Sequence, residues 1–219
     1  MKREVAILTK SSKHGGFCVA GVDLDTGEWV RLVSDDAQTH GALSRRDITY
    51  EDRSICTPLD VVLVDVVEEA PLPHQPENYL IDSRKYWKKT GECTLSDVLD
   101  VHPAEVRPYL YGNLSPFVDG DKIDDIGYSL TLVKVSSLTI SQTTNIYGKP
   151  KTKASFVYNK KWYNNMSVTD PDFYSVPSGS ASISKRRVSY SSCGTVTPSA
   201  RSMACERIAF FRHSALRHT

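Results

Sequence analysis

The sequence predicts a mostly β protein built from two small, partly open five-stranded barrels in tandem. Runs of apolar or alternating residues recur along the first 174 residues, and short turns rather than long helices separate them. The 219 residues are enough for two small domains, each with its own core. Periodicity alone does not separate this arrangement from a single sandwich, but two barrels fit the length better.

The most specific element is a hairpin predicted over residues 16–33. Two apolar or alternating runs flank a short turn at 23–27, where Gly27 can adopt a positive φ. Further strands are predicted from valine-rich or alternating runs at residues 4–9, 59–67, 79–82, 128–140, 154–158 and 161–163.

The second strand of this hairpin carries an aromatic residue beside a cationic one. Alternation places Val30 and Leu32 on one face, and Trp29 and Arg31 on the other. If the aliphatic pair points into a core, Trp29 and Arg31 stand side by side on the outer surface. Such a pair can stack on a base and meet a phosphate. It can equally form a dry seam against a second domain, because tryptophan often anchors interfaces.

Prolines interrupt the β pattern after the fourth predicted strand. Three prolines within residues 71–76 favour extended or turn geometry. Farther on, Thr94 can N-cap a short helix, with an acidic residue three positions later. The expected organisation is a first barrel over 1–82, a short helical or irregular connector over 83–125, a second barrel over 126–174 and an irregular or disordered tail over 175–219.

The predicted tail differs abruptly in composition from the rest of the chain. Residues 175–219 contain eleven serines and seven Lys or Arg against one acid, and only 207–211 are apolar. One explanation is a disordered basic tail. The other is a change of reading frame near 175–184, which would leave the second barrel incomplete and its strand edges exposed.

Charge and cysteine content narrow the functional class. Residues 1–174 carry 20 Lys or Arg against 25 Asp or Glu, a net charge of −5, so any nucleic-acid contact there must be local. Five scattered cysteines without a C-x-x-C pair indicate reduced thiols rather than disulfides or a zinc site. No apolar run is long enough to span a membrane, and the first ten residues lack a signal-peptide core. We therefore expect a cytoplasmic protein with no membrane partner.

No sequence motif indicates an enzyme. Phosphate-binding loops, dinucleotide fingerprints, nucleophile elbows and metal triads are all missing from the sequence, so no catalytic residue, metal ligand or cofactor is predicted. Two acidic stretches fail as calcium loops: in 23–27 the glycine comes one residue early, and in 119–125 Ile123 occupies a position that needs an oxygen ligand. The single histidines are expected at the surface rather than in catalysis; they are His14, His40 and His102.

Several segments resemble the bacterial dual OB-fold-containing domain family. The resemblance is most specific in the first hairpin, at 18–23 and 26–31, and covers about residues 3–174. It implies two OB barrels in tandem and no reaction, with nucleic-acid recognition suggested mainly by the fold. The other matching segments are 58–62, 74–79, 132–135, 154–156 and 168–171.

The expected ligand surface of an OB barrel is the face of strands 2 and 3, together with the loop between strands 1 and 2. In the first barrel this surface brings together the predicted nucleic-acid-binding residues Lys10, Lys13, His14, Trp29 and Arg31. Gly15 and Gly16 would let the backbone of this loop approach a ligand closely.

A second polar cluster lies in the proline-rich crossing and consists of His74, Gln75, Glu77 and Asn78. It either faces a ligand or satisfies the backbone of the crossing and fastens it to the barrel. The sequence thus predicts a non-enzymatic module that binds single-stranded DNA or RNA through the first barrel. The alternative is a protein-interaction or adaptor module without nucleic-acid contact.

Overall fold

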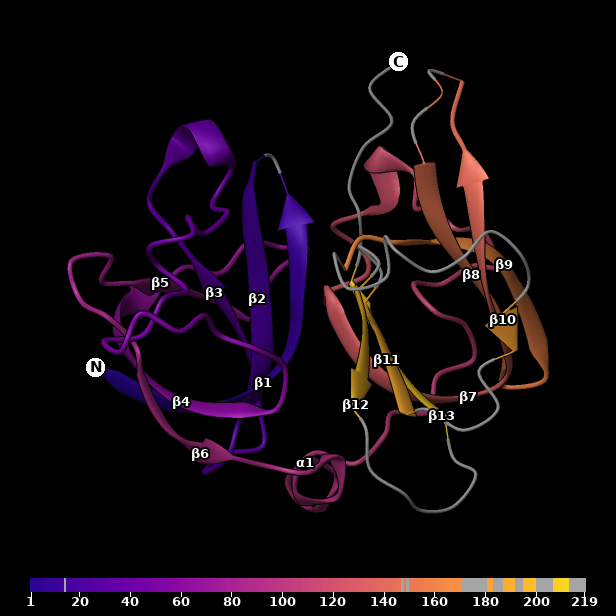
Figure 1. The fold of residues 1–219 in the computed structure, drawn as a ribbon. Coiled ribbons are helices and arrows are strands. Elements are labelled where there is room, and N and C mark those ends of the chain that lie inside the picture. Colours follow the sequence, from indigo (N-terminus) through magenta and orange to yellow (C-terminus); the bar gives the residue numbers. More distant parts are fainter. Residues whose placement is uncertain are drawn as a thin grey trace. The chain divides into compact units, whose positions relative to one another are not determined.

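The computed structural model is mostly β and contains two compact units, Met1–Pro103 and Ala104–Thr219, which we describe separately (Figure 1). The structure describes residues 1–13, 15–146, 148, 150–170, 181–182, 187–191, 195–199 and 207–212. For Lys13 and for the strands beyond residue 170 it describes the backbone alone.

Five strands close the first unit into a barrel. They are β1 (Lys2–Lys13), β2 (Gly16–Asp23), β3 (Trp29–Val33), β4 (Asp60–Glu69) and β5 (Asn78–Ile81). Neighbouring strands follow the order β1-β2-β3-β5-β4, and β1 pairs again with β4 to complete the ring. The β3–β5 pair is parallel and the others are antiparallel. This barrel confirms the predicted fold class for the first unit.

The predicted hairpin is formed by β2 and β3. Its turn is held by Asp23, whose Oδ1 accepts the N–H groups of Asp25 and Thr26 at 3.0 Å. Gly27 follows with a φ of 72°. The first strand, β1, is long because it pairs with β4 along its first half and with β2 along its second. A register shift after Ile7 marks the bulge between the two halves.

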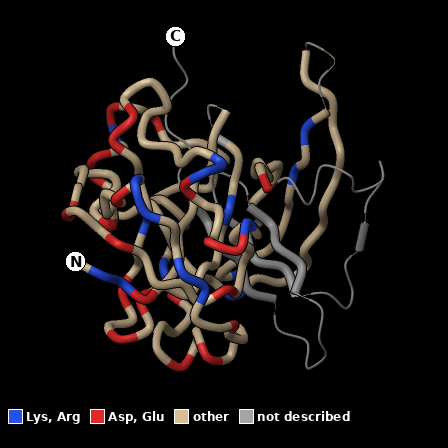
Figure 2. The backbone as a smooth tube through the Cα atoms, turned by 60° about the vertical axis from the view of Figure 1, so that its left-hand side comes forward, with Lys and Arg blue, Asp and Glu red and all other residues tan. Residues whose placement is uncertain are grey.

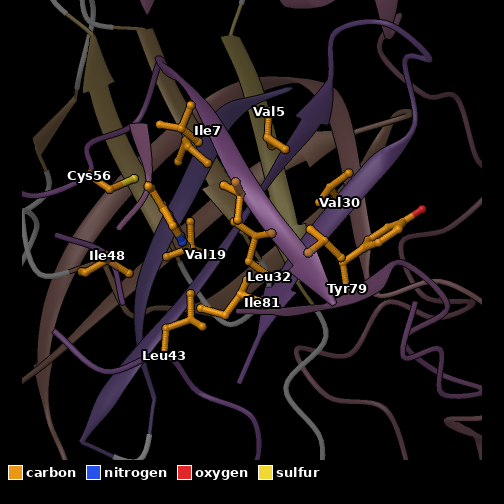
Figure 3. Packing of buried hydrophobic residues seen from close by; sticks show 14 of the residues in the cluster. Val5, Ile7, Val19, Val30, Leu32, Leu43, Ile48, Cys56, Tyr79 and Ile81 are labelled. Atoms are coloured by element: carbon orange, nitrogen blue, oxygen red, sulfur yellow. The ribbon is translucent and has the colours of Figure 1, made fainter. Parts of the chain in front are cut away.

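The core of the first unit lies inside the barrel (Figure 3). Alternate residues of each strand point into it, as the pleat of a strand requires. Trp87, which is 2% exposed, and Ile48 extend this core beyond the strands. The strand residues of the core are Val5, Ile7, Val19, Val30, Leu32, Val62, Val64, Val66, Tyr79 and Ile81.

The predicted connector is not a separate segment between two barrels. Its first part belongs to the first unit, where β6 (Lys88–Glu92) pairs with β4 and is followed by α1 (Leu95–Val101). The helix starts as predicted, because Thr94 and Asp97 form a capping box. The remaining part of the predicted connector, residues 104–125, belongs to the second unit and supplies buried residues to the core of that unit. The two 3₁₀ turns of the chain's described part are η1 (Ala37–Thr39) and η2 (Gly120–Lys122).

The second unit is built on an antiparallel meander of β7 (Leu130–Thr144), β8 (Pro150–Tyr158) and β9 (Lys161–Val168). The β8–β9 turn has two central residues with positive φ, Asn159 at 46° and Lys160 at 62°, as a type I′ hairpin requires. The long strand β7 pairs with two different strands along its length, as β1 does. Its first part pairs with β13 (Arg207–Arg212) and its second part with β8.

Three more strands complete the described part of the second unit: β10 (Ala181–Ser182), β11 (Arg187–Ser191) and β12 (Thr195–Ser199). They and β13 lie in 175–219, where the sequence pattern indicates no alternating strand. The other residues of this predicted tail lie outside the described residues, and so does the stretch 175–184 proposed for a change of reading frame, apart from 181–182.

Candidate functional site

The predicted site in the first barrel is not an open surface. Val30 and Leu32 are buried in the core and Trp29 and Arg31 lie on the opposite face, as alternation predicts. Arg31, however, is only 2% exposed, so its expected place on the outer surface is wrong. Alternation determines the side of the strand on which a residue lies, but it does not determine whether that side faces water.

Trp29 contacts a residue far away in the sequence. His102, which follows α1, meets the indole ring edge-on, with the centroids 4.9 Å apart and an interplanar angle of 67°. Its Nδ1 lies 2.7 Å from the carbonyl oxygen of Gly27. His102 is therefore half-buried rather than the surface residue that the sequence suggested. Its contacts fasten the end of α1 to the β2–β3 turn.

The basic loop of the predicted site also differs from expectation. The Lys10 ammonium donates a hydrogen bond of 2.9 Å to the carbonyl oxygen of Cys56, so it stabilises the irregular stretch before β4. The side chain of Lys13 and the whole of His14 lie outside the described residues. Of the five predicted residues, the structure thus describes three side chains, and they do not form one exposed patch.

The polar cluster in the proline-rich crossing makes internal contacts. Gln75 and Leu72 exchange two backbone hydrogen bonds of 2.9 and 3.0 Å. The Asn78 amide donates to Gln75 Oε1 at 3.3 Å, and the Glu77 carbonyl accepts the N–H of Arg31 at 2.8 Å. Glu77 and Asn78 are buried, whereas His74 is partly exposed. Such internal contacts are expected if the cluster satisfies the backbone of the proline-rich crossing and fastens it to the barrel.

A polar network surrounds the buried carboxylate of Asp60, at the start of β4. Asp60 accepts hydrogen bonds from the Tyr50 hydroxyl at 2.7 Å and the Thr57 N–H at 2.8 Å, and pairs with Lys89 at 2.6 Å. Burial raises the pKa of the neighbouring Cys56 thiol to about 12, so it is not a reactive thiolate. Among the described residues, no group of three or more His, Cys, Asp or Glu could hold a metal ion.

Charge is divided unequally between the two units. Residues 1–103 hold 12 Lys or Arg against 18 Asp or Glu, a net charge of −6, and residues 104–219 hold 15 against 8, a net charge of +7. The stretch 126–169 contains six lysines and no acidic residue. Figure 2 shows how the basic and acidic positions are distributed along the described backbone. An anionic ligand is therefore favoured at the β7–β9 sheet.

The outer face of β8 and β9 carries two of these lysines, Lys151 and Lys153, together with an exposed tryptophan. Thr152, Ala154, Phe156 and Tyr158 are buried, so the alternate residues of β8 point outward. On β9, Trp162 is 57% exposed. Strand pairing places it opposite Val157, and Ser167 opposite Lys153. We call this surface the lysine–tryptophan face; it consists of Lys151, Lys153, Ser155, Val157, Trp162 and Ser167.

One end of the lysine–tryptophan face suits a phosphate group. The Lys153 ammonium donates to Ser167 Oγ at 2.9 Å, and Lys151 lies two residues away on the same strand. Burial, with the charge of Lys151, lowers the pKa of Lys153. Both lysines line a pocket of about 510 Å³, which Thr143 and Ser167 also line. Ammonium and hydroxyl groups together can bind a phosphate, and the indole can stack on a base.

This face was missed in the sequence, although a signal for it exists. The sequence correctly predicts the hairpin 154–158/161–163, but none of its outward residues is among the predicted site residues. The signal is the run of lysines from Lys149 to Lys161 without an acid, ending beside Trp162. The Trp29–Arg31 pair also combines a tryptophan with a cationic residue, but Arg31 is buried whereas Trp162 is exposed.

Comparisons with known proteins place the chain in a family. No helix of the described residues is long and apolar enough to cross a membrane. No curated protein matches the sequence, and no solved structure matches it either. The sequence model of the dual OB-containing domain matches residues 3–191, which extends beyond residue 174 as far as the end of β11. The chain therefore belongs to the dual OB-containing domain family.

Proposed function

We propose that this protein binds single-stranded nucleic acid through the lysine–tryptophan face of its second unit. The OB fold indicates a binding module, and the face of strands 2 and 3 is where such a barrel commonly holds its ligand. In the second unit β8 and β9 follow the first long strand, as β2 and β3 do in the first. The observation that carries the proposal is the 57% exposure of Trp162 on a sheet face that has lysines and no acidic residue.

The chemistry of this face favours a single strand over a duplex. An indole on an open sheet can stack only on a base that is unpaired and accessible, and stacking contributes about 1–3 kcal/mol per base. Lys151 and Lys153 then meet the phosphates that flank it. Each phosphate neutralised contributes a slope of about −0.7 to the dependence of log K on log salt.

The test is the binding of fluorescently labelled single-stranded DNA and RNA 12-mers at two salt concentrations. We expect Trp162→Ala to weaken binding by about fivefold or more, the loss of one stacked base. We expect the double variant Lys151→Gln/Lys153→Gln to reduce the salt slope by about 1.4, which corresponds to two phosphates. Tyr86→Ala is the matched control, because Tyr86 is a 47% exposed aromatic residue of the first unit.

The alternative is a protein-interaction module, which an exposed tryptophan also favours because tryptophan is a frequent interface anchor. Absence of binding at low salt would contradict the nucleic-acid proposal. So would an affinity that Trp162→Ala leaves unchanged. Either result would favour the protein-interaction alternative, in which Trp162 anchors a protein partner. The Trp162→Ala variant should then fail to capture that partner.

A further inference from the structure

A pocket of about 720 Å³ lies in the second unit, between the segment 107–119 and the segment 122–128. Its volume is within the range of pockets that hold small organic ligands. The sequence predicts 83–125 as a helical or irregular connector, yet it contributes Tyr109, Tyr111 and Phe117 to one cavity, which Tyr128 of the predicted second barrel also lines. Tyr109 and Phe117 are 40% and 43% exposed, so the pocket has aromatic groups that solvent can reach.

Planar groups in the pocket are already stacked. The rings of Tyr111 and Tyr128 lie 5.2 Å apart at 21°, and the Arg107 guanidinium lies 3.9 Å from the centre of the Tyr128 ring. Glu105 holds this guanidinium through a hydrogen bond of 2.8 Å from Arg107 Nε. The Tyr128 hydroxyl in turn accepts the N–H of Tyr111 at 3.0 Å. The stack is therefore fixed in advance, and a planar ligand would lose little free energy in ordering it.

The pocket borders the β8–β9 hairpin. The hydroxyl of Tyr158 accepts the N–H of Arg107 at 2.6 Å, so the start of the pocket segment is fastened to the end of β8. The Lys161 ammonium lies 4.7 Å from the centre of the Tyr109 ring, at the first residue of β9. Lys161 precedes Trp162 in the chain, and alternation along β9 directs its side chain to the opposite face of the sheet from Trp162, beside Tyr109.

We infer that this pocket takes a nucleobase. A base is planar and polar along its edge, which matches stacked rings lined by groups of both charges: Lys122, its ion-pair partner Asp119 at 3.8 Å, and Asp125. Lys161 is placed to meet the attached phosphate. The base belongs either to a free nucleotide or to a strand lying on the lysine–tryptophan face, and only the second source depends on the proposed function.

The first experiment tests the pocket without any strand. The ring resonances of tyrosine and phenylalanine are followed by NMR during titration with AMP or UMP, and ribose 5-phosphate serves as the control without a base. We expect the nucleotides to shift the rings of Tyr109 and Phe117, and Phe117→Ala to weaken binding by about fivefold or more. Equal shifts from ribose 5-phosphate, or unchanged nucleotide affinity in Phe117→Ala, would overturn the inference.

The second experiment identifies the source of the base. The affinity of a single-stranded 12-mer is compared with that of a 12-mer whose central nucleotides are abasic, in the wild type and in Phe117→Ala. A penalty for the abasic strand that is smaller in Phe117→Ala assigns the pocket to a base of the strand. Equal penalties, together with nucleotide binding in the first experiment, assign it to a free nucleotide. Trp162→Ala should weaken the 12-mer and leave AMP unaffected, so failure of the proposed function is distinguishable from failure of the pocket.

Discussion

The imidazole of His102 meets the indole of Trp29 edge-on, at a centroid distance of 4.9 Å, while its Nδ1 lies 2.7 Å from the Gly27 carbonyl oxygen. Gly27 and His102 are 75 positions apart in the sequence, and their contact joins the end of α1 to the β2–β3 turn. In the first unit the tryptophan of this hairpin has a structural contact, whereas Trp162 in the second is largely open to solvent. This difference is why we place the ligand on the second hairpin.

Two features of the structure require glycine at position 27: its positive φ and the close approach of Val101. Its φ is 72°, and a Cβ there would overlap the carbonyl oxygen of Val101 at the end of α1. We expect Gly27→Ala to reduce the free energy of unfolding by more than the 1–2 kcal/mol of a positive φ alone, about 3 kcal/mol in urea denaturation. Gly15→Ala is the control, because Gly15 has a φ of 79° and no atom within 4 Å of its Cβ position. Equal losses in the two variants would show that α1 does not press on this turn.

Asp60 is the acceptor on which the buried network of the first barrel depends. Replacing it with Asn removes one of the two carboxylates that pair with Lys89, the other being Glu92 at 2.7 Å, and takes the charged acceptor away from Tyr50 and Thr57. We expect Asp60→Asn to cost about 2 kcal/mol in chemical denaturation, as for the loss of hydrogen bonds to a charged group. Asp52→Asn is the control, since this carboxylate is exposed and accepts hydrogen bonds from the nearby Ser54. A loss no larger than that of the control would contradict a structural role for the network.

The same carboxylate sets a pH dependence of stability. Burial raises the pKa of Asp60, but the hydrogen bonds from Lys89, Thr57 and Tyr50 outweigh it and hold the pKa below its usual value. The contribution of Asp60 is therefore complete above the unfolded pKa of about 3.9 and is lost as the pH falls through the lower folded pKa. Midpoints of denaturation between pH 6 and 2 should fall less steeply in Asp60→Asn than in the wild type. Parallel curves would exclude this linkage.

Arg31 and Glu77 are both buried, at 2% and 8% exposure, and their backbones share a hydrogen bond of 2.8 Å between β3 and the start of β5. A buried charge is costly unless it is compensated, so a double-mutant cycle can test whether these two charges compensate one another. We expect Arg31→Met to cost about 3 kcal/mol, and the cost to shrink when Glu77→Gln is already present. Additive losses would refute the coupling.

Arg84→Met is the control for this cycle, because the Arg84 side chain is 87% exposed. Arg31→Met should also leave the oligonucleotide affinity of the folded protein unchanged, since Arg31 is not part of an open surface. A selective loss of affinity in this variant would restore the first barrel as the binding site.

Lys153 gives the proposed binding face its own pH dependence. Its pKa is lowered by burial and by Lys151, so its charge is lost at a lower pH than that of an ordinary lysine. The affinity for a single-stranded 12-mer should therefore begin to fall below the usual titration range of lysine, near pH 10.4. In Lys153→Arg the guanidinium stays charged and this early decline should disappear. Superimposable pH profiles would show that Lys153 does not contact the strand.

Much of the fold follows from local pattern. The alternation of Val30 and Leu32 against Trp29 and Arg31 predicts the correct faces of β3, and Thr94 with Asp97 predicts the start of α1. Both signals act between residues close in sequence, where backbone geometry and one or two hydrogen bonds decide the outcome. The connector was less predictable, because Leu110 and Tyr111 become core residues only through contacts made in the folded second unit.

The sequence by itself determined that this chain is a mostly β protein of the dual OB family with two tryptophan-bearing hairpins and an unusually basic second half. Only the tertiary structure decided that Trp29 is packed against His102, that Arg31 is buried and that Trp162 is open to solvent. The physical reason is that alternation acts within one strand, whereas burial of its outer face depends on segments distant in sequence. Both hairpins combine a tryptophan with cationic residues, and the segments that surround each hairpin decide whether its tryptophan is packed or exposed.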